Sequence, residues 1–172
     1  SEPLEKMLVF IDAFSVDLKA FNNDFYRKYT SSGISEVKES LVKISKSGRH
    51  LEVTNLVIPE LNDDVGEFKD MIQWVGDELG EKTVLHLSRY FPRYKLTQSP
   101  TPENTLMEFY QIACEKLDFV YIGNLAGNQG QNTFCPACKN LLISRTGYYV
   151  EKKGINPDGN CTQCNTRIIE HN

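Results

Sequence analysis

Four short apolar segments, each joined to the next by one helix-like segment, constrain the fold of this chain most strongly. Their centres lie near Asp17, Thr54, His86 and Tyr121, so they recur about every 35 residues. A strand–helix–strand unit of this length makes neighbouring strands parallel and joins them by right-handed crossovers. The sequence therefore predicts an α/β fold, either an open parallel sheet or part of a (βα) barrel.

The predicted strands carry polar residues on one side. In the stretch SVDLKAF (residues 15–21), Asp17 and Lys19 share one face and Val16 and Leu18 share the other, because strand side chains alternate between faces. The polar side of the next two strands contains His50, Glu52, Thr54, His86 and Ser88. A doubly wound sheet needs nearly continuous apolar strands, whereas a wide barrel keeps polar groups inside for a ligand. We therefore predict part of a TIM-type barrel with parallel strands.

The carboxyl ends of the predicted strands are the expected location of ligand-binding groups. Active sites of (βα) barrels lie at this end, where the loops that follow the strands meet. The polar side chains that end the four predicted strands are Lys19, Asn55, Arg89 and Asn124.

Four of the five cysteines form two pairs, CPAC (Cys135, Cys138) and CTQC (Cys161, Cys164), with 22 residues between them. Two pairs with this spacing supply the four thiolates of a tetrahedral zinc site. Iron held by four cysteines and a pair of disulfides are the alternatives that the residues leave open. Thiolate ligands imply a reducing compartment, so we expect a cytoplasmic protein. Cys114 lies beside the apolar face of a predicted helix and is expected in the core.

A change of composition near residue 123 marks a domain boundary. The stretch GNLAGNQGQNTF (residues 123–134) is rich in glycine and asparagine, and the paired cysteines follow it. Between the pairs, NLLISRTGYYVEKK predicts a hairpin. We predict two domains, the barrel part in residues 1–124 and a zinc-ribbon-like tail in residues 125–172. The tail is too small for a core of its own, so its metal is expected to stabilise it.

Composition narrows the classes of function. The 172 residues carry a formal net charge of -4, which provides no basic field for phosphates and disfavours a nucleic-acid binder. No apolar run of about 18 residues is present, and the first residues lack the pattern of a signal peptide. The sequence therefore predicts a soluble protein that does not enter a membrane.

Four stretches of this sequence resemble one enzyme family. They are IDAFSVDLKAF, EVTNLVIPELND, HLSRYFPRYK and YIGNLAGNQGQNTFCPAC. They resemble the radical S-adenosylmethionine enzymes related to pyruvate formate-lyase activating enzyme, within a subfamily that has a cysteine-rich tail. The resemblance extends over nearly the whole chain.

This resemblance implies that the chain binds S-adenosylmethionine, from which such enzymes generate a 5'-deoxyadenosyl radical that abstracts a hydrogen atom from a substrate. The DLK strand of the family helps to bind this cofactor, which implies contacts from Asp17 and Lys19. A carboxylate suits the ammonium group of the cofactor, and a lysine suits its carboxylate. The other residues expected to bind the cofactor or to shape its pocket are Thr54, Asn55, Arg89 and Asn124.

Two departures from the family pattern limit what the resemblance implies. The activating enzymes carry an arginine where this chain has Thr54, and Arg89 is the guanidinium able to replace it. The family binds a four-iron four-sulfur cluster through CxxxCxxC on an early loop, a motif absent from these 172 residues. CPAC and CTQC do not replace it, because four thiolates on one ion leave no open iron for the cofactor. The resemblance thus implies the C-terminal part of a longer protein, inactive alone, with the cluster in the preceding part.

The expected partners follow from the same resemblance and from the edge of the sheet. The family suggests a protein substrate such as a glycyl-radical protein, and a sheet with an unpaired edge strand favours self-association. Two other functions remain open. One is a noncatalytic module whose four-cysteine ribbon binds a protein; the other is an enzyme that uses His50 or His86 in acid–base or metal chemistry. The sequence identifies no catalytic residue.

Overall fold

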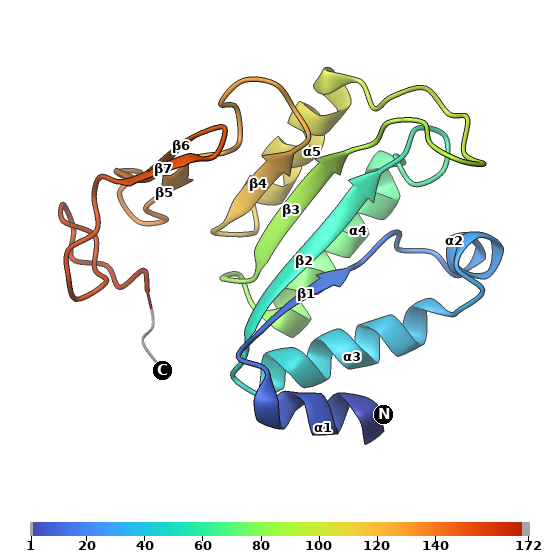
Figure 1. The fold of residues 1–172 in the computed structure, drawn as a ribbon, viewed down its shortest axis with the longest axis horizontal. Coiled ribbons are helices and arrows are strands. Elements are labelled where there is room, and N and C mark those ends of the chain that lie inside the picture. Colours follow the sequence, from blue (N-terminus) through green and yellow to red (C-terminus); the bar gives the residue numbers. More distant parts are fainter. Residues whose placement is uncertain (1, 170–172) are drawn as a thin grey trace. The chain divides into compact units, whose positions relative to one another are not determined.

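The computed structural model describes residues 2–169 and divides into two compact units, residues 1–124 and residues 125–172 (Figure 1). The first unit alternates strands and helices. Its elements are α1 (Glu2–Phe10), β1 (Ala13–Asp17), α2 (Asn23–Tyr29), α3 (Ile34–Lys46), β2 (His50–Val57), α4 (Val65–Trp74), the π-helix η1 (Val75–Leu79), β3 (Val84–Arg89), α5 (Glu103–Cys114) and β4 (Val120–Gly123).

The four strands of the first unit form one parallel sheet in the order β1-β2-β3-β4. This order confirms the predicted βα repetition, since each strand pairs with the next one along the chain. β1 and β4 are the edges, so this unit by itself is an open sheet and not a closed barrel.

One face of the sheet packs against helices and holds the core of the unit. In Figure 1, α4 and α5 lie behind the strands, and α3 contacts β2 and η1. The buried side chains on this face include Phe14, Leu51, Val53, Leu85, Leu87 and Ile122. The rings of Phe68 on α4 and Phe109 on α5 stack with their centroids 4.0 Å apart. This contact packs the two helices against each other on the covered face of the sheet. Burial of such side chains is the main stabilising contribution to a domain of this size.

The opposite face of the sheet, called the open face below, keeps its side chains exposed or half-buried. The burial class alternates along each strand, as expected for a sheet with only one face in the core. The polar and aromatic residues of the open face are Ser15, Asp17, His50, Glu52, Thr54, His86, Ser88 and Tyr121. The polar side that the sequence predicts on three strands is therefore present.

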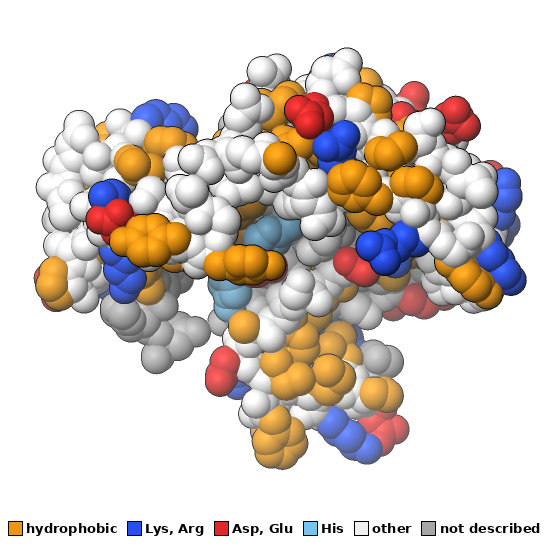
Figure 2. All heavy atoms as spheres, turned by 45° about the horizontal axis from the view of Figure 1, so that its top comes forward, with side chains coloured by type: hydrophobic (Ala, Val, Ile, Leu, Met, Phe, Trp, Pro, Cys, Tyr) orange, Lys and Arg blue, Asp and Glu red, His pale blue; other side chains and the backbone are white. Residues whose placement is uncertain are grey.

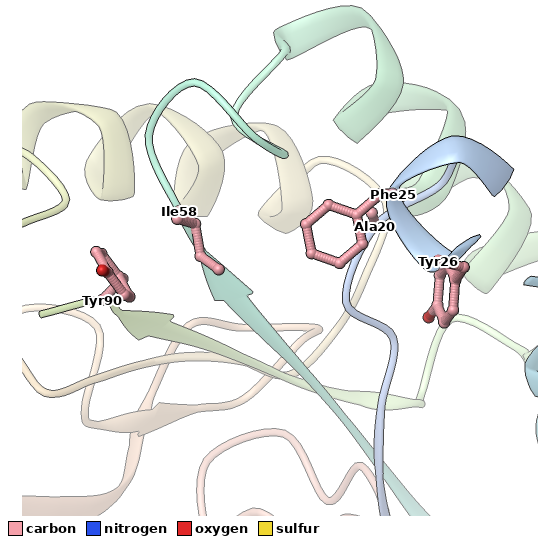
Figure 3. Packing of buried hydrophobic residues seen from close by; sticks show 5 residues of the cluster. All are labelled: Ala20, Phe25, Tyr26, Ile58 and Tyr90. Carbon is pink, nitrogen blue, oxygen red and sulfur yellow. The ribbon is translucent and has the colours of Figure 1, made fainter. Parts of the chain in front are cut away.

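The polar stretch after β1, which the sequence predicts to be a loop, contains a short helix. It is α2, which begins after Asn22, whose side-chain oxygen accepts a hydrogen bond from the Phe25 N–H at 2.7 Å. Phe25 and Tyr26 are buried in a cluster with Ala20, Ile58 and Tyr90 at the carboxyl end of the sheet (Figure 3). The N-cap and this apolar pair were the local signals for the helix.

Two further expectations for the first unit are wrong. The dipeptide Thr101–Pro102 predicts Thr101 as the cap of a helix, but the Thr101 hydroxyl instead donates to the Val57 carbonyl at 2.6 Å and accepts from the Tyr90 N–H at 2.8 Å. It therefore joins the ends of β2 and β3. Cys114, expected in the core, is exposed at the last position of α5.

The second unit contains the predicted hairpin. Its strands are β5 (Thr133–Phe134), β6 (Leu141–Thr146) and β7 (Tyr149–Lys152), paired antiparallel in the order β5-β6-β7. Its buried cluster consists of Cys135, Leu142 and Cys161, so two of the paired cysteines occupy the place of a hydrophobic core. Within residues 2–169, none of the helices has the length and apolar character that crossing a membrane requires.

Candidate cofactor-binding face and candidate metal centre

Four polar or aromatic residues form one row across the open face. Asp17 pairs in register with Thr54, Thr54 with His86, and His86 with Tyr121. Neighbouring strands are about 4.8 Å apart, so each side chain of the row lies beside the next. The centres of the sequence repeat are thus also neighbours in space.

Asp17 and Lys19 form an ion pair at the end of β1. Lys19 Nζ lies 2.7 Å from Asp17 Oδ2, and the side chains are 40% and 55% exposed for Lys19 and Asp17 respectively. An ion pair this exposed contributes little to stability, typically about 0–1 kcal/mol. Both charges therefore remain accessible to a ligand that carries the complementary pair.

Three side chains from other elements hold the main chain of Lys19. The Lys19 N–H donates to the hydroxyl of Tyr26 at 3.0 Å, and the Lys19 carbonyl accepts from the amides of Asn55, at 3.2 Å, and Asn62. In Figure 3, Tyr26 lies on α2 with its hydroxyl directed toward the chain that leaves β1. Burial raises the pKa of Tyr26, so this hydroxyl stays protonated at neutral pH. The position of the Lys19 backbone is therefore fixed by the fold.

Asn55 lies on the opposite side of β2 from its neighbour Thr54. It is only 1% exposed, and its amide nitrogen also donates to the Leu18 carbonyl at 2.7 Å. Asn55 and Thr54 are both expected from the sequence to bind the cofactor or shape its pocket, but adjacent residues of a strand point to opposite faces. Asn55 therefore holds the Asp17–Lys19 segment from the buried side of the sheet.

Arg89 and Asn124 lie at the carboxyl ends of β3 and β4, as predicted, but the side chain of Arg89 is not on the open face. Its Nε donates to the Thr101 carbonyl at 2.9 Å, and its Nη1 lies 3.2 Å from Glu103 on α5. Asn124 is exposed, has a φ of 59°, and donates to the main-chain oxygen of Arg89 at 3.3 Å. Asn124 therefore contacts the main chain of Arg89. The Arg89 guanidinium is directed to Thr101 and Glu103 and not to Thr54 on the open face.

A second polar cluster occupies the open face beside this row. Glu52 Oε2 lies 3.0 Å from Nε2 of His86, and Glu52 Oε1 lies 3.1 Å from Nε2 of His50. The ring of Tyr121 stacks on His86 with centroids 5.5 Å apart. Figure 2 shows the two described histidines, in pale blue, at the surface of the molecule. The sequence predicts Glu52, His50 and His86 on the polar side, but it does not predict that the Glu52 carboxylate contacts both imidazoles.

The four paired cysteines come together in the second unit. Their sulfur atoms all lie within 4.8 Å of one another, with Cys135 3.5 Å from Cys164 and Cys138 3.7 Å from Cys161. A tetrahedral zinc site with bonds of 2.3 Å has sulfur atoms about 3.8 Å apart. These distances are far longer than a disulfide bond of about 2.0 Å. The arrangement fits one metal ion held by four thiolates.

Hydrogen-bond donors next to Cys161 favour its thiolate form. Burial opposes ionisation of Cys161, but the N–H groups of Cys164 and Gln163 and the amide of Asn140 lower its pKa to about 6. The Asn140 amide nitrogen lies 3.7 Å from Cys161 Sγ. Backbone and side-chain donors of this kind orient and tune metal-bound thiolates.

Comparison with curated proteins finds two relatives, and no protein-family model matches the chain. An uncharacterized protein of Methanocaldococcus jannaschii is 43% identical over 165 residues, which are 95% of this chain and 48% of that protein. The (2S)-3-sulfopropanediol dehydratase activating enzyme of Klebsiella oxytoca is 25% identical over 79 residues, which are 46% of this chain and 25% of that enzyme. The chain thus spans less than half the length of either relative.

Comparison with solved structures finds the same kind of fold. A domain of pyruvate-formate lyase-activating enzyme from Bacteroides vulgatus has a TM-score of 0.63 at 14% identity, covering 72% of this chain and 74% of that domain. A radical SAM methyltransferase from Sphaerobacter thermophilus has a TM-score of 0.56 at 16% identity, covering 73% of this chain and 38% of the methyltransferase. In sequence and in fold, the chain therefore resembles the radical S-adenosylmethionine enzymes related to pyruvate formate-lyase activating enzyme.

Proposed function

We propose that the open face binds S-adenosylmethionine and that this chain is the C-terminal part of a radical S-adenosylmethionine enzyme of the activating-enzyme type. One observation carries the proposal. Asp17 and Lys19 present an exposed carboxylate and an exposed ammonium side by side, on a backbone held by Tyr26, Asn55 and Asn62. The methionine moiety of the cofactor carries the same two charges, so each side chain has a partner of opposite sign.

The residues of this chain bind and orient the cofactor in the proposed reaction. Asp17 accepts hydrogen bonds from the ammonium group, and Lys19 pairs with the carboxylate. Thr54, next to Asp17 in the row, contributes a hydroxyl that donates or accepts. Asn55 and Asn62 act by holding the Lys19 main chain in place. In the whole enzyme, one electron from the iron–sulfur cluster would cleave the C5'–S bond of S-adenosylmethionine, which would release methionine and supply a 5'-deoxyadenosyl radical for hydrogen abstraction. A protein is the proposed substrate.

The residues of this chain do not fit an iron–sulfur cluster of the kind that cleaves the cofactor. The four clustered cysteines would saturate a single ion and leave no open position. Since the chain spans 48% of its methanogen relative, we propose that the cluster lies in another part of a longer protein. This chain alone is then able to bind the cofactor but not to cleave it.

The four-cysteine centre is proposed as a structural zinc site. Its four thiolates leave no vacant position for a substrate or water, which is the arrangement of structural zinc. Iron with four cysteine ligands is the alternative. Thiolate ligands also fit a reducing compartment, in agreement with a cytoplasmic location.

The experiment that tests the enzymatic proposal uses the full-length protein, purified without oxygen, with its cluster reduced by dithionite. We expect release of 5'-deoxyadenosine and methionine from S-adenosylmethionine, detected by mass spectrometry. Asp17→Ala should lower this release, and Asp12→Ala, which removes another exposed carboxylate, should not. Equal release by the wild type and by Asp17→Ala would remove Asp17 from the cofactor site.

A second candidate function is that of a noncatalytic module that binds a protein through its ribbon. The observation in its favour is the tip of the β6–β7 hairpin, where Tyr148, Tyr149 and Val150 are 105%, 69% and 57% exposed. Tyrosines of this kind are frequent in protein interfaces. This function predicts partner binding that requires the metal and is unaffected by S-adenosylmethionine.

A further inference from the structure

The cluster around Glu52 is not used by the proposed cofactor site, although it lies on the same face. His86 belongs to the row that starts at Asp17, two strands away. At about 4.8 Å per strand, Asp17 and His86 lie about 10 Å apart across the sheet, so a group bound at His86 is offset from the Asp17–Lys19 pair. His86, Ser88 and Tyr121 are the side chains that β3 and β4 present on the open face.

The hydrogen bond to Glu52 determines which imidazole nitrogen of His86 is protonated. Burial acts to raise the pKa of Glu52, but other contributions, among them the hydrogen bonds from His50 and His86, outweigh burial and lower it. Glu52 is therefore ionised at neutral pH and can only accept hydrogen bonds. Nε2 of His86, 3.0 Å from Glu52 Oε2, must be the donor. In the neutral ring, Nδ1 is then left as a hydrogen-bond acceptor.

Two contacts restrain the ring of His86. The carboxylate of Glu52 fixes its tautomer and its direction, as a buried carboxylate does for a catalytic histidine. The stacked ring of Tyr121, inclined by 29°, fixes the plane of the imidazole. An acceptor atom held in this way is suited to recognise a donor on a ligand.

The charges on the open face argue against an anionic ligand at His86. Glu52 carries a negative charge next to the imidazole, and Asp17 carries another in the same row. Lys19 follows β1, two strands away from His86, and the guanidinium of Arg89 is directed toward Glu103. A carboxylate or phosphate at His86 would therefore meet a like charge without a nearby cation.

We propose that Glu52 and His86 form a second ligand site beside the cofactor site, in which Nδ1 of His86 accepts a hydrogen bond from a hydroxyl or an amide N–H of an uncharged substrate group. Glu52 is a positioning residue in this site, because it acts on the ligand through His86. The inference rests on the proposed function, since it assigns the substrate side of the same face.

Nitrogen NMR of the full-length protein with ¹⁵N-labelled histidine tests this site. The resonances of His86 are identified by their loss in His86→Asn. At a pH where the His86 ring is neutral, we expect the Nε2–H tautomer and a shift of the Nδ1 resonance when the uncharged probes glycerol and N-methylacetamide are added. Acetate and inorganic phosphate should cause no shift. An Nδ1–H tautomer, or a response to the anions and not to the uncharged probes, would overturn the proposal.

Two variants test whether Glu52 orients the His86 ring or only stabilises the fold. Glu52→Gln should turn the single His86 tautomer into a mixture and weaken the response to glycerol. His50→Gln, which alters the other oxygen contact of the same carboxylate, should leave the His86 resonances in the Nε2–H form. Unchanged His86 signals in Glu52→Gln would contradict the role of Glu52.

Asp17→Ala distinguishes a failure of this inference from a failure of the proposed function. If both proposals hold, this variant loses affinity for S-adenosylmethionine but keeps the response of His86 to glycerol. Normal cofactor affinity in both Asp17→Ala and Lys19→Ala would refute the cofactor site alone. A His86 resonance that responds to S-adenosylmethionine and not to glycerol would refute the second site alone.

Discussion

The side-chain amide of Asn62 donates a hydrogen bond to the main-chain oxygen of Lys19, 43 residues earlier in the chain. The same amide donates to the Leu56 carbonyl at 2.9 Å, so Asn62 joins the end of β2 to the turn after β1. The exposed charges of Asp17 and Lys19 are therefore placed by residues that do not face the open side. Mutations of these supporting residues should alter ligand binding indirectly.

Tyr26→Phe should destabilise the protein and weaken its affinity for S-adenosylmethionine. The variant removes the acceptor of the Lys19 N–H, and an unsatisfied polar group costs about 1–3 kcal/mol of stability. Chemical denaturation measures the loss of stability, and calorimetric titration measures the affinity. Tyr29→Phe on the same helix is the matched control, because Tyr29 is 37% exposed. Equal stability of both variants would show that the hydroxyl of Tyr26 does not hold the turn.

Lowering the pH should destabilise the first unit through Glu52. Its pKa is lowered in the folded state from an ordinary value of 4.5, so its contribution to stability is present above pH 4.5. The contribution is lost as the pH falls through the folded-state pKa. Because Glu52 is partly exposed, we expect a small effect. Denaturation midpoints between pH 6 and pH 3 should fall less in Glu52→Gln than in the wild type or in Glu60→Gln. A wild-type midpoint that falls no more than that of Glu52→Gln would exclude this contribution.

Gly154→Ala should destabilise the four-cysteine tail. A Cβ atom at this buried position would lie 2.5 Å from the Leu141 carbonyl oxygen and 2.5 Å from the Asn140 amide nitrogen. Overpacking of this kind costs typically about 1–3 kcal/mol, and Asn140 also contacts Cys161. Metal retention during dialysis against a chelator measures the effect. Gly147→Asn is the control, because nothing lies within 4 Å of its Cβ position and asparagine tolerates the φ of 59°. Equal retention by both variants would contradict the close packing at Gly154.

Cys138→Ser should abolish tight metal binding, and removal of the metal should unfold the tail but not the first unit. Two of the four cysteines form the buried cluster of the tail together with Leu142, so the thiolates need the ion to stay together. Elemental analysis should find one zinc per chain in the wild type and in Cys114→Ser, since Cys114 is outside the four-cysteine group. Full zinc content in Cys138→Ser would contradict the four-thiolate site, and one iron in place of zinc would identify the alternative metal.

The sequence predicted the fold well where a pattern was local. Alternation of polar and apolar residues identified the four strands and the open face, and the spacing of the cysteines identified the metal centre. The helix α2 was missed because one apolar pair in seven residues is a weak periodic signal. The hydroxyl of Thr101 joins β2 and β3 through contacts 44 and 11 residues away, which a local capping pattern does not reveal.

The candidate site was predicted less completely because its contacts are between strands. Asn55 and Thr54 are adjacent in sequence but lie on opposite faces, so their roles differ. The bond between Glu52 and His86 spans 34 residues and depends on the register of β2 and β3. Strand register follows from packing and loop length, and neither is visible in one strand alone.

The most direct test of the central proposal is the affinity of the full-length protein for S-adenosylmethionine, measured by calorimetric titration without oxygen. Wild type and Asp12→Ala should bind equally, and Asp17→Ala and Lys19→Ala should each bind about tenfold or more weakly, a loss of about 1.4 kcal/mol or more. Full affinity in both Asp17→Ala and Lys19→Ala would contradict the assignment of the open face as the cofactor site.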